Sequence, residues 1–125
     1  MRVDWYALAD QTAHAVIDAL PADLKRKVSE IAITLDARPF PGEEQQDGDG
    51  EALLGLFEWP TCIEAGGLIE GGWFAPVIRL YVANLRAEAK DNPARFRREV
   101  RMTLLHELGH YLGLEEDDLE RRGLA

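Results

Sequence analysis

Two histidines and a glutamate near the end of the chain have the spacing found in metal-dependent hydrolases. The segment reads His106-Glu107-Leu108-Gly109-His110, so the two imidazoles are four residues apart. On an α-helix, side chains at this spacing lie about one turn apart on the same face, where both rings can bind one ion. Catalytic Zn²⁺ takes three protein ligands and keeps one position for water. We therefore predict that His106 and His110 bind Zn²⁺ and that Glu107 accepts a proton from water.

An acidic segment after the two histidines can supply the third ligand. Glu115, Glu116, Asp117 and Asp118 are all candidates. The extended zincin pattern places this ligand, usually His or Asp, three residues after a glycine, and counting from Gly113 favours Glu116. Gly113 can also adopt the left-handed conformation that ends a helix and turns the chain back.

The motif requires a helix, and the sequence marks both of its ends. Asn92 is a suitable N-cap, Pro93 fits the first turn, and the helix should run to about Leu112. At 100° per residue its side chains fall into two arcs. The apolar arc, which should pack, contains Val100, Leu104, Leu105, Leu108 and Leu112, whereas the arc that can hold a metal contains Glu99, Thr103, His106 and His110.

The rest of the chain predicts short helices and strands. Helical periodicity runs from Trp5 to Leu20, and a shorter helix should follow Pro21 and reach Val28. Strands are expected at 31–35, 53–59 and 77–82, and the last could serve as a substrate-binding edge strand or as an ordinary internal strand. Residues 41–51 read as an acidic mobile loop and 66–72 as a glycine-rich loop. The order predicts an α+β fold, a small sheet packed on helices with a C-terminal motif helix.

Composition narrows the class of protein. A chain of 125 residues fits one domain spanning 1–125, and its single cysteine, Cys62, excludes an intramolecular disulfide. The formal charge of -9 opposes nucleic acid as a partner. With no apolar run suited to a signal peptide or membrane span, we expect a cytoplasmic protein and no membrane partner.

The chain resembles the compact bacterial zincin-like metallopeptidases with an Asp-zincin type of motif. The resemblance extends over most of the chain and includes the Leu20-Pro21 step, the segment from Leu53 to Glu58, the strand from Ile78 to Val82, and the motif itself. It implies that His106, His110 and the acidic Glu116 bind Zn²⁺. It also implies that Glu107 is the catalytic carboxylate and that the substrate is a peptide or protein.

Two other functions compete with peptide hydrolysis. One is a non-catalytic domain derived from a zincin, which would use the motif helix for metal binding or protein interaction. The other is a metal-dependent nuclease, which the acidic composition opposes. Tyr111 could assist catalysis, although core packing is favoured, and His14 with Asp10 and Asp18 reads as an exposed pairing on the first helix.

Overall fold

A long helix, a three-stranded sheet and four shorter helices make up the part of the chain that the structure describes. It is a computed structural model, and it describes residues 2–39, 52–58 and 76–124. In chain order the elements are α1 (Trp5–Asp18), α2 (Ala22–Lys27), β1 (Ala32–Asp36), β2 (Gly55–Glu58), β3 (Val77–Tyr81), α3 (Val82–Glu88), α4 (Pro93–Leu112) and α5 (Glu116–Arg121).

The sheet has the order β1-β3-β2, with β3 in the centre. β1 pairs with β3 in parallel, so that Leu35 lies opposite Leu80. β2 pairs with β3 in the antiparallel direction, so that Gly55 also lies opposite Leu80. Both sides of β3 are therefore paired, so of the two alternatives for residues 77–82 the internal strand is confirmed and the edge strand is wrong. An apolar run of this kind is typical of a strand buried in the middle of a sheet.

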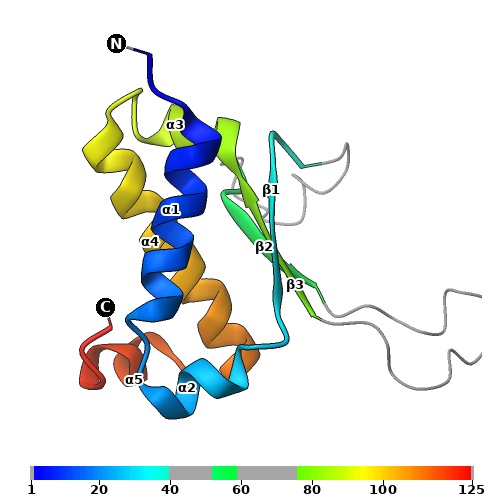
Figure 1. Ribbon diagram of the computed structural model, residues 1–125, viewed down its shortest axis with the longest axis vertical. Coiled ribbons are helices and arrows are strands. Elements are labelled where there is room, and N and C mark those ends of the chain that lie inside the picture. The colour runs from blue at the N-terminus through cyan, green and yellow to red at the C-terminus, as the bar shows by residue number, and fades with distance from the viewer. Residues whose placement is uncertain (1, 40–51, 59–75, 125) are drawn as a thin grey trace, which may run out of the picture.

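The helices cover one face of the sheet (Figure 1). α1 packs on α4 and β1, while α4 also packs against β2 and β3. Alternation along β3 turns Ile78 and Leu80 toward the helices, and both are 0% exposed. On the helix side of the core, the ring of Trp5 meets Phe96 edge-on at 4.9 Å between centroids. The buried layer between sheet and helices is thus the core on which α4 rests.

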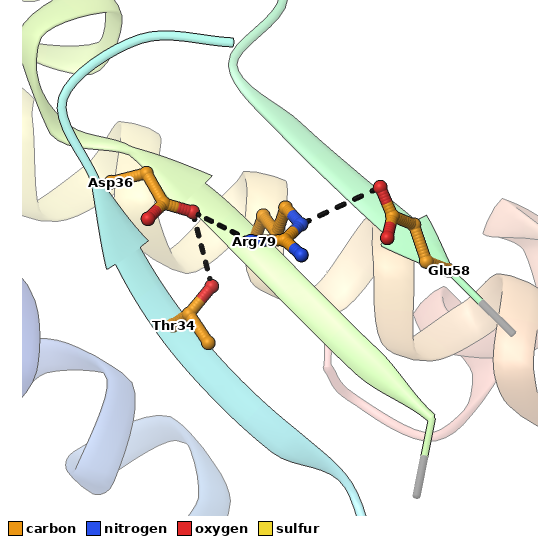
Figure 2. Close-up of polar contacts among 4 residues, drawn as sticks. All are labelled: Thr34, Asp36, Glu58 and Arg79. Carbon is orange, nitrogen blue, oxygen red and sulfur yellow. Dashed lines mark hydrogen bonds and ion pairs between the residues drawn. The ribbon is translucent and has the colours of Figure 1, made fainter. Parts of the chain in front are cut away.

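A charged side chain ties the three strands together on one face of the sheet (Figure 2). Arg79 on β3 lies 3.2 Å from Asp36 on β1 and 3.4 Å from Glu58 on β2. Thr34 donates a hydrogen bond to the same Asp36 oxygen at 3.2 Å. Partial burial disfavours the charged guanidinium, but the hydrogen bond to Asp36 and the two carboxylate charges raise the pKa of Arg79 above its ordinary value. Arg79 therefore stays charged and links both edge strands to β3.

The sequence predicted most of these elements within one or two residues of their ends, and the α+β class is confirmed. α3 was missed because its apolar residues follow β3 directly. Three other predictions fall outside the described residues: the acidic loop at 41–51, the glycine-rich loop at 66–72 and the state of Cys62. The one-domain organisation stays a prediction. None of the described helices is long and apolar enough to cross a membrane.

Gly55 allows β2 to approach α4 closely, and this contact can be tested. A Cβ at this position would lie 2.6 Å from Cγ2 of Thr103 on α4 and 3.2 Å from the carbonyl oxygen of Arg79. We expect Gly55→Ala to lower the free energy of unfolding by about 1–3 kcal/mol, as overpacking does. Urea unfolding measures the loss.

Thr103→Ser supplies the control for that prediction, because it removes Cγ2 and keeps the hydroxyl. In the Thr103→Ser background, Gly55→Ala should therefore lower the free energy of unfolding much less than it does in the wild type. If the two effects simply add, the close contact between β2 and α4 is not what requires glycine.

Candidate metal centre

Three side chains of α4 bring metal-binding atoms together. His106, Glu107 and His110 each offer one ligand atom, and these atoms all lie within 4.8 Å of one another. Among the described residues this is the one group of three or more such side chains that could hold an ion. The two rings are 4.4 Å apart between centroids and inclined at 65°. The structure thus brings together the three residues that the motif predicted to act together.

The two histidines and the glutamate differ in their exposure. Each imidazole is 54% exposed, whereas the side chain of Glu107 is only 9% exposed. Glu107 Oε2 lies 3.6 Å from Nδ1 of His110. A buried carboxylate is costly unless it has a partner, and the neighbouring imidazole, or a cation bound between the two rings, supplies one. The centre therefore has an open side, formed by the rings, and a protected carboxylate at its wall.

The local sequence explains why α4 extends through the motif and then ends. The side chain of Asn92 accepts a hydrogen bond from the backbone N–H of Arg95 at 3.1 Å, which caps the first turn. Pro93 follows at a position where no N–H is required. At the other end Gly113 has φ 70° and ψ 25°, the left-handed conformation. Both boundaries agree with the sequence prediction.

The turn at Gly113 brings the acidic segment back toward the histidines. The N–H of Leu114 donates to the carbonyl of Gly109 at 2.8 Å, and Leu119 on α5 is buried in the core at 5% exposure. This return places Oε1 of Glu116 at 4.0 Å from Nδ1 of His106. Two ligand atoms of one tetrahedral zinc ion lie roughly 3.3 Å apart, given bond lengths of about 2.0–2.1 Å. The exposed Glu116 side chain therefore needs only a small movement to share an ion with His106.

The other acidic candidates are placed differently. Asp118 accepts a hydrogen bond from the N–H of Glu115 at 2.9 Å and one from Arg121. These two donors hold the pKa of Asp118 below its ordinary value. Glu115 and Asp117 are exposed and, unlike Glu116, are not among the described residues that line the groove at the histidines. Of the four candidates, Glu116 is the one that the fold brings to the site.

A groove of about 460 Å³ runs between β2 and α4 and contains the centre. The chain segment 52–56 forms one wall, and the face of α4 bearing the histidines forms the other. Phe57 on β2 and Tyr111 on α4 meet edge-on at 5.7 Å, which holds the two walls together. The sequence did not predict that residues 52–56 would form a wall of the site. This segment meets α4 only through tertiary packing, and no short sequence motif indicates that contact.

The donor set suits a divalent transition metal. Two imidazole nitrogens and a carboxylate oxygen are the ligands of many zinc sites, and imidazole is well suited to zinc. The ligand atoms of His106, Glu107 and His110 lie within 4.8 Å of one another. Glu116 is not part of that group, and its exposed side chain approaches His106 to 4.0 Å. The residues present therefore fit a metal such as zinc.

Other residues singled out in the sequence lie away from this centre or pack within the fold. His14 pairs with Asp10 on the surface of α1, 2.9 Å from its carbonyl oxygen and 3.5 Å from its carboxylate. The predicted exposed pairing is confirmed for Asp10, whereas Asp18 pairs with Lys25 of α2 at 3.7 Å. Tyr111 is partly buried and packs against the core.

Comparison with known proteins supplies the class. Residues 28–124 match the sequence profile described as zincin-like metallopeptidase, and the chain belongs to this family. Family and geometry together support a metal-binding zincin-like domain.

A solved structure supports the same fold. The chain is similar to a conserved hypothetical protein from T. thermophilus, with a TM-score of 0.57 and 25% sequence identity over 86% of this chain and 94% of that one. No curated protein matches the sequence.

The conformation of Gly113 is testable because nothing lies within 4 Å of where its Cβ would be. Any loss of stability on substitution must therefore come from the backbone. We expect Gly113→Ala to lower the free energy of unfolding by about 1–2 kcal/mol. Gly113→Asn, which tolerates the left-handed region better, should lose clearly less. Equal losses for the two variants in urea unfolding would contradict this account of the turn.

Proposed function

We propose that this protein is a zinc-dependent peptidase that uses the groove between β2 and α4 as its active site. The observation that carries the proposal is the placing of His106 and His110 beside a buried Glu107. A site that only stabilised the fold would need a closed set of four protein ligands. Here the two rings are half-exposed and face a groove, which leaves room for water and substrate.

The chain's own residues divide the work between holding a metal and moving a proton. His106, His110 and Glu116 would hold Zn²⁺, which when bound supplies a Lewis acid that polarises a carbonyl and acidifies water. Glu107 would take the proton from the attacking water and then deliver it to the departing amine. Its position suits this role, because the side chain is only 9% exposed and lies at the protected wall of the centre, beside His110. No other buried carboxylate among the described residues lies at the centre.

The edge of β2 is suited to align an extended substrate. The N–H of Tyr81 donates to the carbonyl of Leu54 at 3.0 Å, so the backbone of Leu54 faces β3. In an antiparallel pair the backbone groups of successive residues point to opposite sides. Those of Gly55 therefore point away from β3, on the side where no described strand pairs with β2. An extended peptide could add to this edge and pass over the histidines.

The charge of the groove opposes the nuclease alternative. The ionisable side chains that line it among the described residues are Glu99, Glu107, Glu116 and the two histidines, with no lysine or arginine. Phosphate backbones are repelled by such a surface. That nucleic acid is not a partner stays a prediction.

Glu107→Gln tests the proton-transfer role. The substitution keeps the size of the side chain and removes its basicity, so bound zinc should be retained while turnover of a cleaved peptide falls by at least about 100-fold. Zinc content is measured by elemental analysis, and turnover by mass spectrometry of a peptide mixture. Glu120→Gln, the same change on the exposed face of α5, is the control and should leave both unchanged.

The outcomes of that experiment separate the proposal from its alternative. Zinc-loaded wild-type protein that cleaves no peptide of the mixture would favour a non-catalytic zincin-derived domain. Full turnover in zinc-loaded Glu107→Gln would exclude Glu107 as the base.

Glu116→Gln tests the third ligand. Removing a residue that only hydrogen-bonds to a metal ligand typically weakens metal affinity by about 10–100-fold. Removing a direct ligand should therefore weaken zinc affinity by more than about 100-fold. Glu115→Gln and Asp117→Asn make the same charge change on either side and should keep the affinity of the wild type. Competition with a chromophoric chelator measures the affinity. Equal affinities in all three variants would remove Glu116 from the ligand set.

A further inference from the structure

A third carboxylate in the groove has no role in the proposed chemistry. Glu99 lies on α4 two turns before His106 and lines the same groove, partly buried. A separation of seven residues rotates a helix by almost two full turns, so Glu99 and His106 share one face. No hydrogen bond or ion pair engages the Glu99 carboxylate among the described residues, although Arg95 is one turn away. Its carboxylate therefore lines the groove without a paired cation from the described residues.

The groove wall nearest Glu99 is largely apolar. Met102, one turn further along α4, lines the groove and is 58% exposed, one of the few large apolar side chains that the described part of the chain leaves open. Leu53 and Leu54 belong to the opposite wall of the groove. An exposed methionine costs hydrophobic stabilisation unless something covers it. The site near Glu99 thus combines an adaptable apolar wall with one carboxylate.

This combination matches one kind of substrate side chain. Lysine and arginine carry a long apolar stem that lies along apolar surface and a cationic head that stays near water or a carboxylate. A neutral apolar side chain would use Met102 but leave Glu99 unpaired, and an acidic side chain would be repelled by it. We propose that Glu99 is a specificity-determining residue that selects a peptide with a lysine or arginine side chain in this part of the groove.

The spacing along α4 also predicts where that side chain lies in the peptide. Seven residues of helix rise about 10 Å, and an extended peptide advances about 3.3 Å per residue. The preferred basic residue should therefore lie about three residues from the bond that is placed at the histidines. This inference rests on the proposed function for its peptide substrate, but it can be tested by binding alone.

The test uses zinc-loaded full-length Glu107→Gln protein, in which bound peptides should remain intact. Its ligands are pools of short random peptides with one fixed position, which is lysine, acetyl-lysine or aspartate, and binding is measured by fluorescence anisotropy. The lysine pool should bind about two- to fivefold more tightly than the acetyl-lysine pool, the range expected for a partly exposed ion pair. Adding Glu99→Gln should bring that ratio to about one, and Glu99→Lys should make the aspartate pool the tighter binder.

A matched variant controls for net charge. Glu88→Gln on the exposed face of α3 makes the same charge change outside the groove and should keep the lysine preference. Melting curves and zinc content confirm that each protein is folded and loaded. A lysine preference that survives in Glu99→Gln, or the absence of any preference in the parent protein, would overturn the assignment.

The same pools separate this inference from the proposed function. Zinc-loaded wild-type protein that binds lysine peptides through Glu99 but cleaves none of them would refute the peptidase and leave the specificity intact. Cleavage with equal preference in wild type and Glu99→Gln would support the peptidase and refute the role of Glu99.

Discussion

The buried stripe of α4 is the constraint on which the site depends. Phe96, Val100 and Leu104 are 0% exposed, and Leu108 is 2% exposed. Each such side chain contributes about 1.5–3 kcal/mol when it is buried. Rotating α4 about its axis would expose all four, and the stabilisation lost would be far larger than any surface interaction could supply. The rotation of α4 is therefore fixed by its packing on α1 and the sheet. His106 and His110 face the groove because the opposite arc of the helix is held in the core.

The same rotation explains the contrast between the histidines and Glu107. One residue further along a helix lies about 100° around its axis, which places Glu107 at the border between the groove face and the buried stripe. Its carboxylate reaches the centre from the protein side, whereas the rings reach it from the solvent side. Packing of β2 against this border, through Gly55 and the Phe57–Tyr111 contact, forms the second wall. The packing of α4 thus decides which side chains of the motif are exposed to the groove and which one is shielded.

Local signals made α4 and its turn predictable, and the absence of local signals explains what was missed. Asn92, Pro93 and Gly113 each act within one helical turn, so their effects can be read from neighbouring residues. The parallel pairing of β1 with β3 joins segments about 45 residues apart and depends on the core as a whole. α3 begins at the residue after β3, where the apolar sequence continues and only tertiary packing decides between strand and helix. The second wall of the groove was missed for the same reason as the sheet order.

Metal content per chain tests the central claim most directly. Protein purified without a chelating tag is incubated with zinc, freed of excess and measured by elemental analysis, with His110→Ala as the comparison. The account predicts about one zinc per wild-type chain and a large loss in the variant, because the two imidazoles on one face of α4 hold the ion together. Wild-type protein that stays empty after incubation, or a variant that keeps its zinc, would contradict it.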